Sequence, residues 1–221
     1  MSDFSTARQK MVDGQVRPSD VTNLRIIDAL LAVPREDFVP ASQRPVAYLD
    51  LDLEVSEPGA PKRYLIKSVV LARMLQAAEI RNTDNVLVVG CSTGYSAAVV
   101  SRIAAKVTAT APDKALAAKA GDRLASLGCA NVTFVAAATA AGHAANGPYD
   151  VIVLAGAFEV VPTALYQQLA GGGRLVGVSA LERPSRAVVV TQSRDDFGTR
   201  QLFDASAPVL PGLERLPGFV F

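Results

Sequence analysis

Tryptophan is absent from this chain of 221 residues, which has only one histidine and two cysteines. The cysteines, Cys91 and Cys129, are too few for the disulfide framework of a small secreted domain. The histidine, His143, lies in an alanine-rich stretch with no serine, cysteine or carboxylate at the spacing of a catalytic triad, so we expect it in a surface loop. No group of His, Cys and Asp residues has the spacing of metal ligands, and we predict no metal site.

Charge and long apolar segments are also scarce. The formal net charge is +1, so no global field attracts nucleic acid or an anionic membrane. Apolar runs are broken by glycine, proline or charge before they can span a bilayer, and residues 1–6 lack the pattern of a signal peptide. We therefore expect a cytoplasmic protein with no nucleic-acid or membrane partner. Half of the residues are apolar, which is enough for one well-buried α/β domain.

The most informative stretch is residues 86–95, Val-Leu-Val-Val-Gly-Cys-Ser-Thr-Gly-Tyr. Four uninterrupted apolar residues predict a strand that is covered on both faces. Gly90 and Gly94 then bracket a short turn, and an apolar helix follows. Such a turn favours a positive φ at glycine and lets the backbone approach a ligand at the helix N-terminus. The alternative is a tight turn without a ligand, because this glycine spacing alone is a weak signal.

The rest of the chain alternates between helical and extended patterns. Helices are predicted at residues 20–31 with Asp20 or Thr22 as the cap, at 68–79, from the apolar residues at 97–100 to about Ala104, from Asp113 to Gly128, and from about Pro162 to before Gly171. Strands are predicted at residues 86–90, 107–111, 132–136, 150–154, 174–181, 186–193 and 199–205, with a turn at 194–198. Prolines indicate loop and short extended pieces at 40–63.

Repeated strand–helix units followed by a hairpin predict an α/β fold, with a mostly parallel sheet and an antiparallel C-terminal hairpin. We expect residues 1–80 to form an N-terminal helical and extended layer packed on the core, and residues 81–221 to form that core as one structural unit. The turn at 90–94 then lies at the carboxyl edge of the sheet, where α/β folds bind ligands. Cys91 in this turn is either a reactive thiol or, as we expect, a small packing residue.

Several blocks resemble the protein-L-isoaspartate O-methyltransferase family and follow the order of that family. Residues 11–17 (Met-Val-Asp-Gly-Gln-Val-Arg), 33–40 (Val-Pro-Arg-Glu-Asp-Phe-Val-Pro) and 47–50 resemble its N-terminal region. The match continues through residues 71–75, 86–95, 148–152 and 171–176. The resemblance implies a Rossmann-like class I methyltransferase fold and S-adenosylmethionine as cofactor. It also implies methyl transfer to the carboxylate of an isoaspartyl residue in a protein or peptide, which is a repair reaction.

The same resemblance implies a cofactor site at the glycine turn, formed by Gly90, Cys91, Ser92, Thr93, Gly94 and Tyr95. Positions where the family carries acids toward the cofactor hold none here. Val88 replaces the acid of the first strand, Ala111 replaces the acid that binds the ribose, and residues 135–141 contain no carboxylate for the adenine. Asp113 is the candidate replacement at the ribose, with helix capping as its alternative role. Each lost charge-assisted hydrogen bond is worth roughly 1.5–3 kcal/mol, so we expect weak cofactor binding.

The acceptor side departs from the family as well. In the register set by residues 71–75, Ile66 replaces the family serine near the methyl-accepting carboxylate. Lys67 and Ser68 are the polar candidates beside it, and the sequence assigns no catalytic residue. The first hypothesis is an active isoaspartyl methyltransferase of divergent sequence. The second is a catalytically degenerate relative that acts as a binding or scaffold protein, and a third is a pocket for another nucleotide-like ligand.

Overall fold

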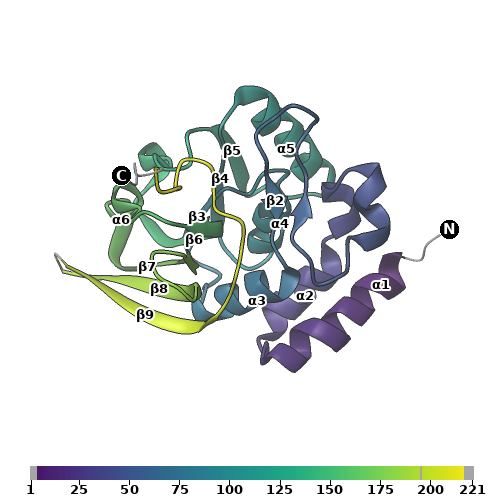
Figure 1. Cartoon of the computed structure of the whole chain (residues 1–221), viewed down its shortest axis with the longest axis horizontal. Helices are drawn as coiled ribbons and strands as arrows, with labels where there is room; N and C mark the ends of the chain where they lie inside the picture. Colours follow the sequence, from purple (N-terminus) through teal and green to yellow (C-terminus); the bar gives the residue numbers. More distant parts are fainter. Residues whose placement is uncertain (1–3, 195, 217–221) are drawn as a thin grey trace, which may run out of the picture.

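The computed structural model describes residues 4–194 and 196–216 (Figure 1). The α-helices are α1 (Phe4–Met11), α2 (Leu24–Ala32), α3 (Ser68–Ala77), α4 (Tyr95–Ser101), α5 (Lys114–Ser126) and α6 (Thr163–Tyr166). The strands are β1 (Leu53–Glu54), β2 (Tyr64–Leu65), β3 (Asn85–Val89), β4 (Lys106–Ala111), β5 (Val132–Ala136), β6 (Tyr149–Phe158), β7 (Leu169–Ser179), β8 (Arg186–Ser193) and β9 (Asp196–Asp204). Short 3-10 or π turns are η1 (Val12–Val16), η2 (Arg17–Ser19), η3 (Arg35–Phe38), η4 (Ala41–Val46) and η5 (Ala144–Asn146).

The central sheet has the strand order β5-β4-β3-β6-β7-β8-β9. Strands β3 to β7 pair in parallel, whereas β8 is antiparallel to both of its neighbours. The predicted fold, a mostly parallel sheet with an antiparallel C-terminal hairpin, is therefore confirmed. Parallel strands place their carboxyl ends along one edge, and this edge carries the loops that form the candidate site.

Helix α5 shows how local signals set the elements around the site. The Asp113 side chain accepts a hydrogen bond from the Leu116 N–H at 2.7 Å, which satisfies a free donor in the first turn. At the other end, Gly128 has a φ of +71°, the left-handed conformation that commonly ends a helix. The predicted start and end of this helix are both confirmed, and so is the capping role of Asp113.

Three sequence predictions of element boundaries were wrong. Helix α2 begins at Leu24 with Asn23 as its cap, because the Gln76 side chain binds the backbone N–H groups of Thr22 and Asn23 and holds them outside the helix. The helix near Pro162 is the single turn α6, and the glycines at 171–173 lie inside β7 instead of after a long helix. Strand β9 begins at Asp196, which pairs with Ser193, so the predicted turn at 194–198 was too long.

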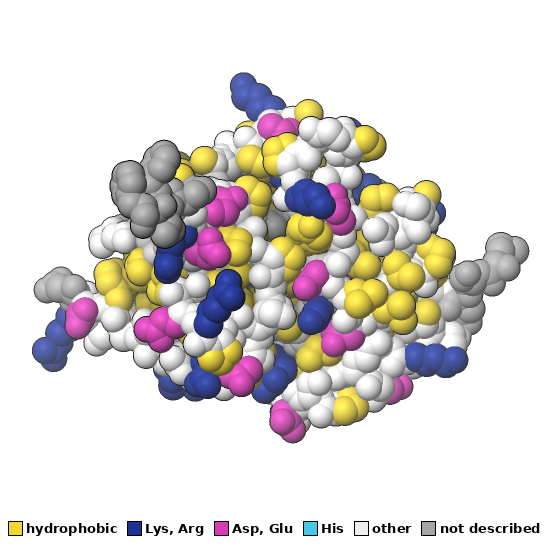
Figure 2. Space-filling model, in the orientation of Figure 1, with side chains coloured by type: hydrophobic (Ala, Val, Ile, Leu, Met, Phe, Trp, Pro, Cys, Tyr) yellow, Lys and Arg dark blue, Asp and Glu magenta, His cyan; other side chains and the backbone are white. Residues whose placement is uncertain are grey.

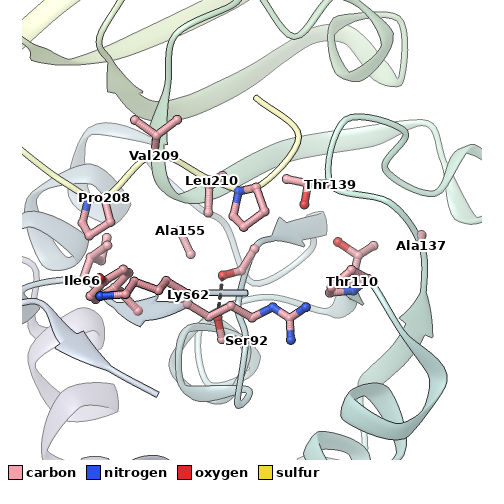
Figure 3. Close-up of a pocket in the computed structure, with 15 residues that line it drawn as sticks. Lys62, Ile66, Ser92, Thr110, Ala137, Thr139, Ala155, Pro208, Val209 and Leu210 are labelled. Carbon is pink, nitrogen blue, oxygen red and sulfur yellow. Dashed lines mark hydrogen bonds between the residues drawn. The ribbon is translucent and has the colours of Figure 1, made fainter. Parts of the chain in front are cut away.

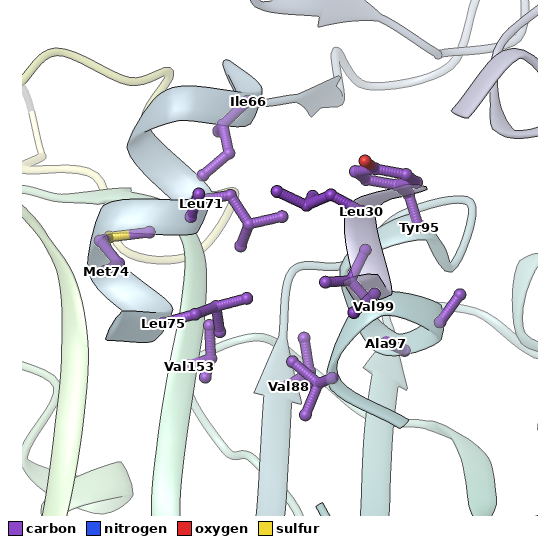
Figure 4. Close-up of a cluster of buried hydrophobic side chains, with 14 of the residues drawn as sticks. Leu30, Ile66, Leu71, Met74, Leu75, Val88, Tyr95, Ala97, Val99 and Val153 are labelled. Atoms are coloured by element: carbon purple, nitrogen blue, oxygen red, sulfur yellow. The ribbon is translucent and has the colours of Figure 1, made fainter. Parts of the chain in front are cut away.

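The sheet is covered on both faces. One apolar cluster joins the N-terminal layer and helices α2, α3 and α4 to one face of the sheet, and Figure 4 shows Leu30, Leu71 and Val99 meeting above Val88 and Val153. The other cluster packs α6 on the opposite face. Alternate residues of β3 serve the two clusters, as expected for a strand that is buried on both sides. The boundary at residues 80/81 stays a prediction.

The molecular surface carries charges of both signs. Figure 2 shows lysine and arginine interspersed with aspartate and glutamate over the face in view, so no single-sign patch dominates it. Within the described residues, no helix is long and apolar enough to cross a membrane. The cytoplasmic location and the absence of nucleic-acid and membrane partners stay predictions.

Candidate functional site

The turn between β3 and α4 holds three residues in the left-handed backbone region. The angle φ is +75° at Gly90, +48° at Ser92 and +101° at Gly94, which confirms the expected positive φ at Gly90. A hydrogen bond of 2.8 Å from the Gly94 N–H to the Cys91 carbonyl closes the turn. A Cβ on Gly94 would meet Leu124 at an ordinary 3.5 Å, so the backbone angle, and not a lack of space, favours glycine there.

A narrow cavity lies at the carboxyl ends of β3, β4 and β6, and we call it the strand-edge cavity (Figure 3). Its volume is about 30 Å³, whereas sites that enclose a small-molecule ligand measure roughly 300–1,000 Å³. The cavity is lined by the turn, the strand ends, the segments around β2 and a C-terminal segment. Its lining residues are Lys62, Arg63, Tyr64, Ile66, Gly90, Ser92, Thr110, Pro112, Ala137, Thr139, Ala155, Pro208, Val209, Leu210 and Pro211.

The C-terminal segment of residues 207–213, here called the strap, crosses the sheet edge after β9 (Figure 1). It is attached to the end of β6 by backbone hydrogen bonds. The Ala157 N–H donates to the Pro208 carbonyl at 2.9 Å, and the Leu210 N–H donates to the Ala157 carbonyl at 2.8 Å. The strap therefore forms a short parallel bridge to β6 directly beside the glycine turn.

Leu210 is the strap residue that packs against the glycine turn in the wall of the strand-edge cavity. Its side chain is buried, and a Cβ built on Gly90 would lie 2.4 Å from its Cδ2. A Cβ built on Gly156 would lie 2.7 Å from the same atom. Both glycines therefore leave room for this leucine. Sequence analysis missed the strap, for which the available signal was the Pro-Val-Leu-Pro run at 208–211 after the last strand.

The structure brings only some of the predicted cofactor residues to this cavity. Gly90 and Ser92 line it, whereas Thr93 and Asp113 line a second cavity beside α5 together with Ser92. Cys91, Gly94 and Tyr95 are buried, and none of them lines either cavity. Burial raises the pKa of the Cys91 thiol to about 12, so the thiol is protonated at neutral pH and the packing interpretation of Cys91 is the better one.

Comparisons with known proteins identify the family. Residues 6–201 match the family model of protein-L-isoaspartate(D-aspartate) O-methyltransferase. The chain belongs to this family. A protein-L-isoaspartate O-methyltransferase of Roseiflexus castenholzii is 38% identical over 95% of this chain and 94% of its own length. One of Koribacter versatilis is 38% identical over 80% of this chain and 78% of its own length.

Solved structures of isoaspartate O-methyltransferases have the same fold. One protein-L-isoaspartate O-methyltransferase superposes with a TM-score of 0.80 at 25% identity, over 93% of this chain and 66% of that longer one. A putative Plasmodium falciparum relative, solved with S-adenosyl-L-homocysteine, has a TM-score of 0.70 at 14% identity, over 95% of this chain and 99% of its own length. At that identity the second likeness concerns the fold alone.

The positions at which this family member lacks acids are apolar in the structure as well. Val88 is fully buried in the cluster that joins the N-terminal layer to the sheet, and Ala111 is buried at the end of β4 beside its partner Ala136. Asp113 caps α5 through Oδ1, while its Oδ2 lies 3.7 Å from Arg63 Nη1. Its side chain is half exposed. Asp113 therefore keeps acceptor capacity beyond the cap, although its first role is structural.

The segment around Ile66, which holds the place of the family serine, lies between the cavity and the core. Ile66 lines the strand-edge cavity and also packs in the core cluster of Figure 4. Lys67 does not line this cavity, and its backbone N–H donates to Asp52 Oδ1 at 2.9 Å. Ser68 is buried at the start of α3 and does not line the cavity either. The two polar candidates thus follow Ile66 in the chain without lining the cavity.

Arg35 anchors the segment around Ile66 to the N-terminal layer. It is fully buried, and it donates to the Ala47 carbonyl from Nε and to the Ile66 carbonyl from Nη2, each at 2.9 Å. Its guanidinium lies over the Tyr95 ring, 4.7 Å from the centroid. Burial lowers the pKa of Arg35, but a guanidinium keeps its charge in proteins. This cation therefore ties the N-terminal layer, the Ile66 segment and the first residue of α4 together.

Three polar atoms of this region have no hydrogen-bond partner among the described residues. They are Arg35 Nη1, Tyr95 OH and Ser68 Oγ, and all three are buried. Burial raises the pKa of the Tyr95 phenol, an effect that the neighbouring Arg35 and Ser68 oppose. Among the residues that the structure describes, no cluster of His, Cys, Asp and Glu fits a metal ion.

Proposed function

We propose that this chain transfers a methyl group from S-adenosylmethionine to the free carboxylate of an isoaspartyl residue in a protein or peptide. The observation that carries the proposal is the family match over residues 6–201, together with a cavity at the carboxyl edge of β3 and β4 in the same chain. When bound, the cofactor supplies an electrophilic methyl group on a sulfonium. The named relatives favour catalysis over the alternative of a non-catalytic binding protein.

The residues present accommodate such a cofactor only in part. The left-handed turn brings Gly90 and Ser92 to the wall of the strand-edge cavity, where the lack of a side chain on Gly90 lets a ligand approach the backbone. Asp113 is the only carboxylate at the end of β4 that a ribose could use. Against this, the strand-edge cavity measures only about 30 Å³ with Leu210 in its wall, so the Leu210 side chain has to rotate away before a nucleoside fits.

In this reaction the protein mainly positions the reactants. The acceptor carboxylate is already the nucleophile, so the chain needs no general base, and holding the two reactants in line supplies most of the rate. The segment at Ile66 forms the wall nearest the acceptor, and Arg35 holds the carbonyl of that residue. A branched apolar side chain desolvates the substrate anion without giving it a hydrogen bond, so turnover is slow.

The cofactor affinity is expected to be weak, because Val88 and Ala111 offer no acceptor. We expect a dissociation constant above roughly 100 μM, since each tenfold change corresponds to about 1.4 kcal/mol. Calorimetric titration with S-adenosylhomocysteine measures it directly. Ala111→Glu is expected to tighten binding by restoring an acceptor at the end of β4. Micromolar affinity of the wild-type chain would contradict the reasoning on the missing acids.

The activity is tested by transfer of a labelled methyl group to a short isoaspartyl peptide. The matched control peptide carries ordinary aspartate at the same position. We expect slow but specific labelling of the isoaspartyl peptide and an increase in Ile66→Ser, which restores the family hydroxyl. Lys67→Ala is expected to change little, because Lys67 does not line the cavity. Equal labelling of both peptides, or none in any variant while cofactor binds, would refute the proposed reaction.

A further inference from the structure

A second cavity, here called the α5 cavity, opens beside the strand-edge cavity. Its volume is about 410 Å³, within the roughly 300–1,000 Å³ range of ligand sites. One wall is a single face of α5, formed by Leu116, Lys119, Ala120 and Arg123, which follow the three- and four-residue spacing of a helix. The opposite walls are residues 38–40, 55–58 and 60.

Most of the lining of the α5 cavity is apolar, and two of its three basic side chains have an ion-pair partner while the third has none in the part of the chain that the structure describes. Arg63 is paired with Asp113 at 3.7 Å, and Lys119 is paired with Glu57. Arg123 makes no ion pair within residues 4–194 and 196–216, and its guanidinium lies over the Phe38 ring at 5.6 Å from the centroid. An aromatic contact leaves the N–H donors at the edge of the guanidinium available. The cavity thus offers one unpaired cation among apolar walls.

The two cavities are adjacent. Arg63 and Ser92 line both of them, and Figure 3 shows Ser92 on the lower side of the residues that line the strand-edge cavity. A peptide chain that places its isoaspartate against the Ile66 wall of the strand-edge cavity therefore brings a neighbouring side chain past Arg63 to the α5 cavity. Successive residues of an extended chain lie roughly 3.3–3.4 Å apart along its axis, so a residue one or two positions away is within reach.

We propose that the α5 cavity binds an acidic side chain next to the isoaspartyl residue of a peptide substrate, with Arg123 as its ionic partner. This rests on the proposed function and specifies its substrate class. Glutamate fits best, because its methylene groups contact the apolar walls while its carboxylate meets the guanidinium. A basic neighbour is disfavoured, because it meets an unpaired cation beside two ion pairs that are already complete.

The test uses fluorescent isoaspartyl peptides that are identical except for Glu, Gln or Lys at one position, placed before or after the isoaspartate. Binding is measured by anisotropy and methyl transfer by label incorporation. We expect the Glu peptide to bind about two- to fivefold more tightly than the Gln peptide at low ionic strength, the range of a partly exposed ion pair, and less so with added salt. Arg123→Met is expected to abolish this preference, and Arg123→Lys to retain part of it. The matched control is Lys114→Met, which removes the same charge from α5 outside the cavity.

The outcomes separate this inference from the proposed reaction. If the Gln peptide is methylated but wild type shows no Glu preference on either side, or Arg123→Met keeps it, the α5 subsite is wrong and the reaction stands. If no peptide is methylated while the binding preference is present and lost in Arg123→Met, the subsite stands and the reaction is wrong. A loss of S-adenosylhomocysteine affinity in Arg123→Met with an unchanged peptide preference would assign the cavity to the cofactor and overturn the inference.

Discussion

Gly90 is expected to be intolerant of alanine for two separable reasons. Its φ of +75° is left-handed, and an alanine in that region costs about 1–2 kcal/mol. Its Cβ would also lie 2.4 Å from Leu210 Cδ2 and 3.1 Å from Cδ1. Leu210 is buried and also packs closely against Gly156, so it can avoid the new Cβ only by changing its rotamer. Overpacking of this kind typically costs about 1–3 kcal/mol. We therefore expect Gly90→Ala to lower the free energy of unfolding by about 2–5 kcal/mol.

A matched glycine and a double-mutant cycle separate the two contributions. Gly128 has nearly the same φ, +71°, but nothing within 4 Å of its Cβ, so Gly128→Ala should show the backbone cost alone. Leu210→Ala alone is expected to cost about 2–5 kcal/mol because it leaves a cavity. In the Gly90→Ala background the same change also removes the clash, so the double variant should be more stable than additivity predicts by about 1–3 kcal/mol.

Urea unfolding at one temperature measures all four proteins of the cycle and the control, with the slopes compared to exclude a change in the unfolded state. The reasoning is refuted if Gly90→Ala costs no more than Gly128→Ala. It is equally refuted if the cycle shows no coupling, because Leu210 then does not pack on Gly90 in solution.

Two further predictions concern the buried groups around the turn. Burial raises the pKa of Cys91 to about 12, so the folded state keeps this proton at a pH where the unfolded thiol, with a pKa near 8.5, loses it. The contribution of this group to the free energy of unfolding should therefore fall as the pH rises above about 9. In urea unfolding from pH 8 to 10.5, Cys91→Ala should remove this pH dependence, whereas Cys129→Ala should keep it. Arg35→Met leaves the carbonyls of Ala47 and Ile66 unpaired and should lower the free energy of unfolding by about 3 kcal/mol or more, and it should also raise the KM for the peptide. Arg35→Lys should recover part of both effects. Wild-type stability and KM in Arg35→Met would contradict the positioning role.

The sequence predicted those elements whose signals are local. Helix α5 carries its cap at Asp113 and its terminator at Gly128, and strands β5 and β8 have the predicted bounds because each is a short run of β-branched and apolar residues between turns. The prediction failed where a side chain that is distant in the sequence sets the boundary of an element. Thr22 and Asn23 are held by Gln76 of α3, and glycine is needed at position 173 of β7 because a Cβ there would lie 2.8 Å from the Tyr149 carbonyl.

The same limit applies to the candidate site. The glycine turn was predicted from its own residues, since strand, turn and helix are contiguous there. The strap and the contact of Arg123 with Phe38 were not predicted, because each joins residues that are far apart in the sequence and the residues around one partner do not indicate the other. The family resemblance identified positions that lack acids, but it gave no indication that Leu210 packs against Gly90 at this edge of the sheet.

Leu210 joins the stability of the fold to the ability of the site to accept a ligand. The strap is held by backbone hydrogen bonds at Ala157, so the leucine side chain can rotate while the strap stays in place. Rotation gives up the packing of a buried side chain against Gly90 and Gly156, roughly 1.5–3 kcal/mol of apolar contact, and a ligand that displaces Leu210 has to supply that energy on binding. Since 1.4 kcal/mol is a factor of ten, this displacement alone weakens binding about ten- to a hundredfold. The weak cofactor binding that we propose then has two separate sources, the missing acceptors and the displacement of Leu210, and Leu210→Ala distinguishes them because it removes the second without touching the first.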